Sequence, residues 1–233
     1  MKRQIAALTL AALLLAGCGR GETPTRPLPA ETGPDLPAEA PTEAFLRRPG
    51  TLWRIDGMSD FSAYHVVTEY WRDAGADADD VYCVFTCLNQ NGSVLWTHES
   101  PRSSAGAQVQ PIWPLGFLDG RFLYYVQGRV VALEEQTGNP LWESPDTGIC
   151  LSAPEAALLD YDGFICLGEY FGSNLAVLDL DGNLIREIPT LDPDLYWISS
   201  LTRQEDSLVV HLDGGGSDSL SGTDLTVPID WIP

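Results

Sequence analysis

Few side chains in this sequence combine the type and the spacing that catalysis needs. The three histidines, His65, His98 and His211, stand far apart and lack the i, i+4 or cysteine-pair spacing of zinc sites. No Gly-x-Ser-x-Gly motif, which would expose a nucleophilic serine, occurs. Lys2 is the only lysine, so a chain from which the N-terminal segment with Lys2 has been removed has no lysine amine for Schiff-base chemistry. We therefore predict no catalytic residue, no cofactor and no metal ion, and expect a protein that is not an enzyme.

One acidic segment places oxygens at alternate positions. Asp179-Leu180-Asp181-Gly182-Asn183 resembles the start of a calcium loop, but its twelfth position is Thr190 and not glutamate. A hairpin turn is the simpler interpretation, because Asp-Gly between apolar runs is a strong hairpin signal.

Four cysteines lie beyond residue 18, namely Cys83, Cys87, Cys150 and Cys166. Cys83 and Cys87 fall on one expected strand, about 13 Å apart at about 3.3 Å per residue, which exceeds disulfide reach. Cys150 and Cys166 flank a hairpin whose register pairs Cys166 with a residue near Ala157. Buried free thiols are the prediction, and the alternatives of a disulfide or of a redox or metal pair stay open.

The fifth cysteine, Cys18, has the context of a modification site. Met1 to Gln4 is basic, and residues 5–16 form an apolar run too short to span a bilayer. The following Leu15-Ala16-Gly17-Cys18 resembles the bacterial lipobox. This resemblance implies that residues 1–17 are a signal peptide and that Cys18 carries a diacylglycerol, with a further acyl chain such as palmitate on the new N-terminus. The alternative is an ordinary cleaved signal followed by a chance cysteine.

Residues 18–50 have the composition of a tether. Seven prolines and almost no large apolar residue occur before Phe45 and Leu46, so the segment cannot bury enough surface to order itself. Proline-rich linkers are extended and semi-rigid. We expect a lipidated cysteine and a spacer that hold a folded domain, residues 51–233, outside the cytoplasm. The lipid would anchor it to the outer face of the cytoplasmic membrane, or to an outer membrane if the organism has one.

The net charge of −20 narrows the classes of partner. Nucleic-acid binding requires a basic surface that neutralises phosphates, and electrostatic adhesion to anionic lipid requires the same. We therefore expect no nucleic-acid partner and no such adhesion. A strongly acidic surface instead suits cations or the basic patches of other proteins.

The folded part contains a repeat of about 44 residues. Each unit reads as an apolar strand, a tight turn with glycine, and a short strand that begins Leu-Trp. The anchor segments are Thr51-Leu52-Trp53-Arg54-Ile55, Asn91-Gly92-Ser93-Val94-Leu95-Trp96, Thr137-Gly138-Asn139-Pro140-Leu141-Trp142 and Asp181-Gly182-Asn183-Leu184-Ile185, the last with isoleucine in place of tryptophan. Three or four short strands at this period are typical of a β-propeller blade, and no helical periodicity follows the tether.

The third unit, Ala132-x-Glu134-x-x-Thr137-Gly138-x-x-x-Trp142, resembles the repeat of the pyrroloquinoline-quinone-type (PQQ-like) propellers. The resemblance implies an all-β fold, a small propeller of PQQ-like or WD40-like blades. It also implies that tryptophans dock between neighbouring blades. The residues assigned to this structural role are Trp53, Trp96, Trp142, Gly92, Gly138 and Gly182, with Ile185 as a weaker substitute.

Four blades are expected, with the ring closed by pairing of the N-terminal strand Thr51–Ile55 with the last blade. The alternative is an open half-propeller that completes itself by dimerising.

The sequence favours a non-enzymatic, membrane-anchored propeller that binds or scaffolds another envelope or surface protein. A glycan or small-solute receptor that uses aromatic loops is the first alternative. A degenerate quinoprotein or hydrolase is the second.

Overall fold

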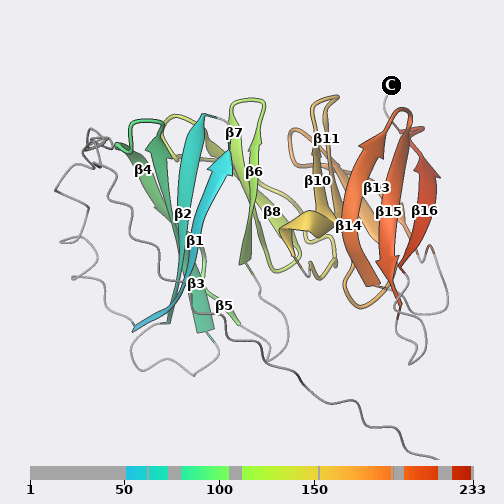
Figure 1. The fold of residues 1–233 in the computed structure, drawn as a ribbon, viewed down its shortest axis with the longest axis horizontal. Helices are drawn as coiled ribbons and strands as arrows, with labels where there is room; N and C mark the ends of the chain where they lie inside the picture. Colours follow the sequence, from blue (N-terminus) through green and yellow to red (C-terminus); the bar gives the residue numbers. More distant parts are fainter. Residues whose placement is uncertain are drawn as a thin grey trace, which may run out of the picture. The chain divides into compact units, whose positions relative to one another are not determined.

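The computed structural model describes residues 51–61, 63–72, 80–104, 112–151, 153–189, 191, 197–214 and 222–231. They belong to one compact unit, Glu39–Pro233. The predicted signal peptide, Cys18 and most of the tether lie outside these residues. Within the described ranges the regular elements are β-strands and one short 3-10 helix, η1 (Pro154–Ala156), so the all-β prediction is confirmed (Figure 1). No helix in the described part of the chain is long and apolar enough to cross a membrane.

The strands form four antiparallel sheets, named A to D in chain order. Sheet A contains β1 (Thr51–Phe61), β2 (Tyr64–Arg72), β3 (Asp80–Asn89), β4 (Val94–Glu99) and the short β5 (Ser103–Ser104). Sheet B contains β6 (Ile112–Leu118), β7 (Arg121–Val126), β8 (Arg129–Glu134) and β9 (Pro140–Glu143). Sheet C contains β10 (Ala157–Asp160), β11 (Phe164–Gly168), β12 (Leu175–Asp179) and β13 (Leu184–Ile188). Sheet D contains β14 (Trp197–Gln204), β15 (Ser207–Asp213) and β16 (Thr223–Pro228).

Consecutive strands are neighbours in every sheet, so each sheet is a series of hairpins. The turn that follows the third strand is alike in sheets A and C. The side chains of Asn89 and Asp179 each accept two backbone N–H bonds, and Gly92 and Gly182 adopt positive φ angles of 76° and 81°. The turn around Asp179 confirms the hairpin interpretation of that acidic segment. A glycine is required at these positions because other side chains rarely adopt such angles.

Apolar side chains fill the spaces between successive sheets. One cluster joins sheets A and B, with Phe85 of β3 against Phe122 and Tyr124 of β7. A second cluster runs through sheets B, C and D and includes Ala132, Ile165 and Leu208. Because β8 and β12 are buried on both faces, their sequences are nearly continuous apolar runs. Four small antiparallel sheets with apolar faces packed in this way are compatible with a propeller-like fold.

The prediction for the N-terminal strand is wrong. β1 pairs along its length with β2, with Leu52 opposite Trp71 and Phe61 opposite Tyr64, and not with the last sheet. Ring closure by Thr51–Ile55 is therefore not seen, and the side chain of Trp53 lies outside the described residues. The physical reason is that β1 continues to Phe61, which brings its whole length into a hairpin with β2.

The far face of sheet D also disfavours closure. Alternation along β15 buries Leu208, Val210 and Leu212 against sheet C and turns His211 outward. His211 pairs there with Asp224 of β16 at 2.5 Å. Closure of the ring would place this polar outer face of sheet D against sheet A, where its charged pair would lose contact with water.

In sheet C the residue that corresponds to the repeat tryptophans is Arg186, one residue after the predicted Ile185. Cys87 pairs with Trp96 and Ala132 pairs with Trp142, in each case beside a bulge. In sheet C the same position of β12, Val177, pairs with Arg186. Arg186, and not Ile185, therefore stands where the other sheets carry tryptophan, while Ile185 occupies the bulge position of Leu95 and Leu141.

Candidate functional site

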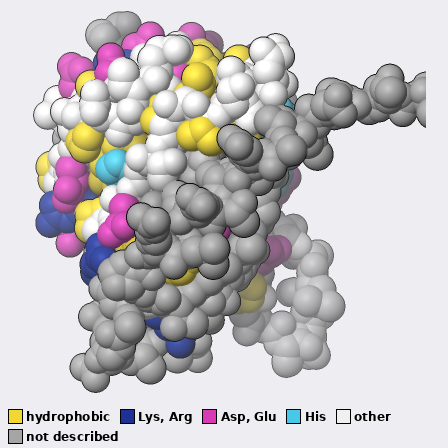
Figure 2. All heavy atoms as spheres, turned by 90° about the vertical axis from the view of Figure 1, so that its left-hand side faces the viewer, with side chains coloured by type: hydrophobic (Ala, Val, Ile, Leu, Met, Phe, Trp, Pro, Cys, Tyr) yellow, Lys and Arg dark blue, Asp and Glu magenta, His cyan; other side chains and the backbone are white. Residues whose placement is uncertain are grey.

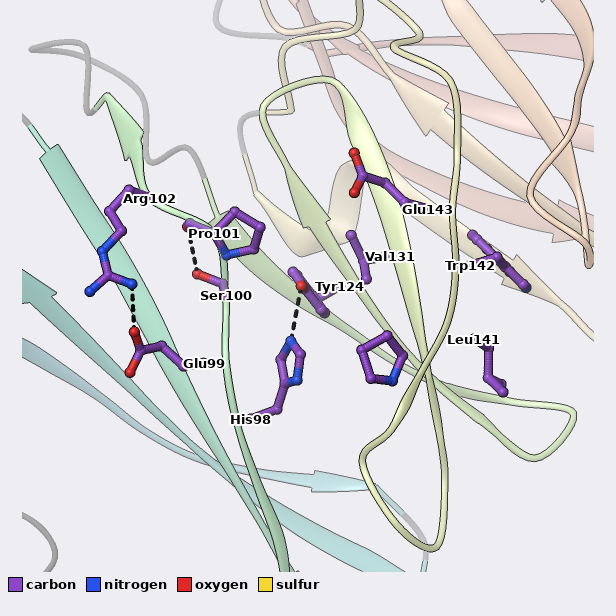
Figure 3. Close-up of a pocket in the computed structure, with 11 residues that line it drawn as sticks. His98, Glu99, Ser100, Pro101, Arg102, Tyr124, Val131, Leu141, Trp142 and Glu143 are labelled. Atoms are coloured by element: carbon purple, nitrogen blue, oxygen red, sulfur yellow. Dashed lines mark hydrogen bonds and ion pairs between the residues drawn. The ribbon is translucent and has the colours of Figure 1, made fainter.

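A groove lies between the outer strands of sheets A and B (Figure 3). Its volume is about 470 Å³, within the range of small-molecule sites. The chain from His98 to Arg102 forms one wall, the outer strand β9 forms the other, and Tyr124 and Val131 form the floor. The full lining consists of His98, Glu99, Ser100, Pro101, Arg102, Tyr124, Val131, Pro140, Leu141, Trp142 and Glu143.

Two side chains meet inside the groove. His98 Nε2 lies 3.2 Å from the hydroxyl of Tyr124, and their rings are 5.6 Å apart. Burial lowers the pKa of His98, an effect that neighbouring Glu99 opposes. Burial also raises the pKa of Tyr124 far above its ordinary value, and Glu143 adds to that shift. At neutral pH this pair offers hydrogen bonds without a formal charge.

Two ion pairs lie at the groove, each through a glutamate that lines it. Arg102 binds Glu99 at 2.5 Å, and Arg129 binds Glu143 at 3.2 Å. All four side chains are well exposed, so these ion pairs contribute little to stability and can rearrange for a ligand. Between them, the side chain of Leu141 on β9 is half exposed.

Ser100, the hydroxyl group in the groove wall, is committed to the backbone. Its Oγ accepts the N–H of Cys83 at 2.9 Å and donates to the carbonyl of Pro101 at 3.0 Å. Ser144 repeats this arrangement in sheet B with Val130 and Pro145, at 2.9 Å for both bonds. Ser100 and Ser144 thus each link the end of an outer strand to the third strand of the same sheet, an arrangement that we call a serine clasp. Both hydrogen bonds of Ser100 are structural, so it is not placed as a nucleophile.

The tryptophans of the repeat lie on glycines of the next sheet. A Cβ atom added to Gly138 would lie 2.7 Å from the indole of Trp96, and one added to Gly182 would lie 2.5 Å from that of Trp142. Trp96 Nε1 also donates to the carbonyl of Glu135 at 2.7 Å. In contrast, a Cβ atom on Gly92 would meet no atom within 4 Å. Of the six residues assigned to docking, Trp53 is the one whose side chain is not described.

A different tryptophan lies beside Arg186 in sheet C. The guanidinium of Arg186 lies 5.5 Å from the ring of Trp231 and binds Asp230 at 2.9 Å. The Trp231 ring meets Phe164 of β11 edge to face at 5.9 Å. Trp231, which follows β16, thus supplies an indole on the side of sheet C from which the repeat tryptophan is missing.

Cys83, Cys87, Cys150 and Cys166 form no disulfide with one another in the structure. Cys83, Cys87 and Cys166 are buried, and Cys150 is half buried. Cys166 pairs with Leu158, one residue from the predicted neighbour. Burial raises the pKa of Cys87 to about 11, so this thiol stays protonated at neutral pH. No cluster of three metal-ligating side chains occurs among the residues that the structure describes.

Sequence reasoning did not identify the groove. Its parts come from β4 and the residues after it, and from β7, β8 and β9, and their nearness depends on the packing of sheet A on sheet B. One signal was available: Glu99-Ser100-Pro101 recurs as Glu143-Ser144-Pro145, which marks the clasps at the ends of two outer strands.

Comparisons with known proteins do not place the chain in a family. No family model matches it, and no curated protein matches it. Among solved structures it is similar to the computationally designed protein Ika8, with a TM-score of 0.38 and 11% identity over 74% of this chain and 71% of that one. It is also similar to a eukaryotic initiation factor, with a TM-score of 0.34 and 8% identity over 77% of this chain and 54% of that one. Likenesses this weak carry no conclusion about function.

Proposed function

We propose that the chain is an exported lipoprotein, anchored by lipid on Cys18, whose PQQ-like propeller body binds another envelope or surface protein in the groove between sheets A and B. The lipobox-like tetrapeptide and the proline-rich tether support export and lipid anchoring. Two or more acyl chains would hold the chain stably to a membrane. The sheets would form the blades of the propeller.

The observation that carries the binding proposal is the composition of the groove. The exposed Pro101 and Pro140 provide apolar contact area for a partner side chain, above a floor formed by the buried Val131 and Tyr124. The His98–Tyr124 pair supplies neutral hydrogen-bonding groups at the floor. A few polar groups among apolar walls are typical of sites that hold a ligand.

The adjoining strand suits an extended segment of a partner. β9 is the outer strand of sheet B, so one of its edges has no strand beside it in the described sheet. An exposed edge accepts a peptide through main-chain hydrogen bonds, and alternate side chains of that peptide then enter neighbouring pockets. On the rim, Glu99 pairs with Arg102 and Glu143 pairs with Arg129, so charged side chains of a bound segment can exchange with these exposed ion pairs.

A photo-cross-linking amino acid placed at Leu141 in the full chain, within the intact envelope, tests this function. We expect a discrete protein adduct whose yield falls at least tenfold when the partly buried His98 is changed to Ala. The matched control is the same cross-linker at Tyr161, which is 86% exposed in the β10–β11 turn. Equal adducts from both positions, or no adduct from Leu141, would contradict the proposal.

A second candidate function rests on a different cluster. Tyr170 meets Phe171 edge to face at 4.7 Å and Trp197 at 6.1 Å, and Phe171 is 62% exposed. Exposed aromatic rings offer platforms on which sugars can lie. A glycan array probed with wild-type chain and with Phe171→Ala separates this function from the first, since glycan binding that depends on Phe171 would favour the receptor alternative.

A further inference from the structure

His98 reaches into the groove with one of its two ring nitrogens already engaged. Its Nε2 lies 3.2 Å from the hydroxyl of Tyr124, a side chain that is buried at the floor. The ring of His98 starts from β4 on one wall and extends toward β9 on the other (Figure 3). Within the described part of the chain, His98 Nδ1 makes no hydrogen bond. One ring nitrogen in the groove is therefore available to a ligand.

The hydroxyl of Tyr124 decides which nitrogen of His98 carries the proton. A buried hydroxyl needs an acceptor for its hydrogen, and His98 Nε2 is the one that the described residues supply. Nε2 therefore accepts, and a neutral imidazole that accepts at Nε2 carries its proton on Nδ1. Burial lowers the pKa of His98, so the ring is mainly neutral at neutral pH. The available nitrogen is thus an N–H donor, which requires an acceptor from the ligand.

The charges around the groove favour a neutral acceptor over an anion. Two carboxylates, of Glu99 and Glu143, line it together with one guanidinium, of Arg102. That guanidinium is bound to Glu99, and Arg129 beyond the lining is bound to Glu143. On the face seen in Figure 2, the described acidic and basic side chains likewise lie next to one another. A carboxylate or phosphate in the groove would be repelled by the glutamates, whereas an amide carbonyl would not.

The two walls also suit the backbone of an extended segment. Successive carbonyls of such a segment point to opposite sides, so a segment that bonds to the edge of β9 directs other carbonyls toward the β4 wall, where His98 lies. Pro101 and Pro140, on the two walls, are exposed and offer contact area to an apolar side chain beside that carbonyl.

We infer that His98 determines the specificity of the groove by donating Nδ1–H to a main-chain carbonyl of a partner's extended segment. The inference rests on the proposed function of the groove and adds the group of the partner that is recognised. The segment bonds to β9 along one edge and to His98 along the other. Tyr124 is a positioning residue, because it holds the proton of His98 on the nitrogen that is left for the ligand.

Histidine side-chain NMR tests the donor in the absence of a partner. In the full chain with Cys18→Ser, which remains unlipidated, we expect His98 to be protonated on Nδ1 and not on Nε2 at pH 7.5. Tyr124→Phe removes only the hydroxyl, so part of the proton population should move to Nε2. His211 is the internal reference, because Asp224 holds its Nδ1 and this contact should not change. A proton on Nε2 of His98 with Tyr124 in place would overturn the inference.

Two tripeptides test what the donor recognises. Acetyl-Ala-Leu-Ala-amide offers neutral carbonyls, and the same peptide with a free C-terminal carboxylate adds an anion. We expect the neutral peptide to shift the Nδ1 signal of His98 and the acidic one to bind no more tightly. His98→Phe keeps an aromatic ring without the donor and should weaken binding about fivefold or more. His211→Phe on sheet D is the matched control and should leave binding unchanged. Tighter binding of the acidic peptide, or binding of neither, would overturn the inference.

A double variant separates the donor from folding. His98→Phe alone leaves the Tyr124 hydroxyl without its acceptor, whereas His98→Phe with Tyr124→Phe removes both groups and should bind as weakly as the single variant. The cross-linker at Leu141 then distinguishes the two proposals. Loss of the protein adduct in the double variant supports both. An adduct that survives there overturns the role of His98 but not binding in the groove, and the absence of any adduct from the wild-type groove contradicts the proposed function itself.

Discussion

The indole of Trp96 lies on Gly138, closer than any side chain at that glycine would allow. The contact joins the outer strand of sheet A to the turn of sheet B, and Trp142 and Gly182 repeat it one sheet further on. Each sheet alone is too small to bury its own apolar faces, so the sheets are stable only when packed on one another. The Trp–Gly contact adds one close residue pair to that packing at each junction.

Replacement of the covered glycines by alanine should destabilise the chain more than replacement of an open one. All of these glycines have positive φ, which costs alanine about 1–2 kcal/mol. At Gly138 and Gly182 the added methyl group also collides with an indole, which adds about 1–3 kcal/mol. Urea unfolding of Gly138→Ala, Gly182→Ala and the control Gly120→Ala measures the difference. Equal losses in the free energy of unfolding for all three variants would show that the contact between glycine and indole does not contribute to stability.

Trp96 should contribute far more to stability than the arginine at its equivalent position. Trp96 is 5% exposed and packs against Phe122, so Trp96→Ala should cost about 3–5 kcal/mol. Arg186 and Asp230 are both well exposed, so Arg186→Ala should cost less than about 1 kcal/mol. Denaturant midpoints at a constant m-value check the ranking. A loss at Arg186 as large as that at Trp96 would contradict it.

The repeat predicted this packing only in part. The Gly-containing turns and the apolar third strands are local signals, and Gly138, Gly182, Trp96 and Trp142 lie at the sheet junctions where such signals placed them. The match at Thr51–Ile55 was misleading because no apolar run like Val130–Leu133 precedes it in the sequence, and β1 instead pairs with β2.

The error at Ile185 has a related cause. The segments were aligned on leucine, whereas the bulge after each turn fixes the register from the glycine. Counted from Gly92 and Gly182, Trp96 corresponds to Arg186. The groove was not predicted, since the nearness of His98 to Tyr124 depends on the packing of two sheets, and the recurrence of Glu99-Ser100-Pro101 was its one local signal.

The serine clasps should act as two equal and independent elements. Ser100→Ala and Ser144→Ala each leave a buried backbone N–H, of Cys83 and of Val130, without its acceptor. Each loss should cost about 1–3 kcal/mol. The two sites share no partner, so the double variant should show the sum within about 0.5 kcal/mol. Chemical denaturation measures all three, and a change below about 0.5 kcal/mol in the single variants would show that the clasps are dispensable.

His98 should make stability depend on pH in mildly acidic solution. Burial lowers its pKa in the folded chain below the ordinary value of about 6.5. The unfolded chain therefore binds the proton more readily, and stability should fall as the pH drops below about 6.5. Above that pH both states are neutral at this residue and it contributes no slope. Comparison of urea unfolding for wild type and His98→Gln between pH 7.5 and pH 5 isolates this part of the pH dependence. Identical slopes for the two proteins would contradict the assignment.

The mass of the mature N-terminal peptide tests the proposed lipoprotein most directly. The full precursor is expressed in a bacterial host, the membrane fraction is isolated, and the terminal peptide is analysed by mass spectrometry. We predict a peptide that begins at Cys18 and carries a diacylglycerol, with Cys18→Ser blocking both the modification and the membrane association. A mature chain that begins at any other residue, or an unmodified Cys18 in a chain released from the membrane, would contradict the account.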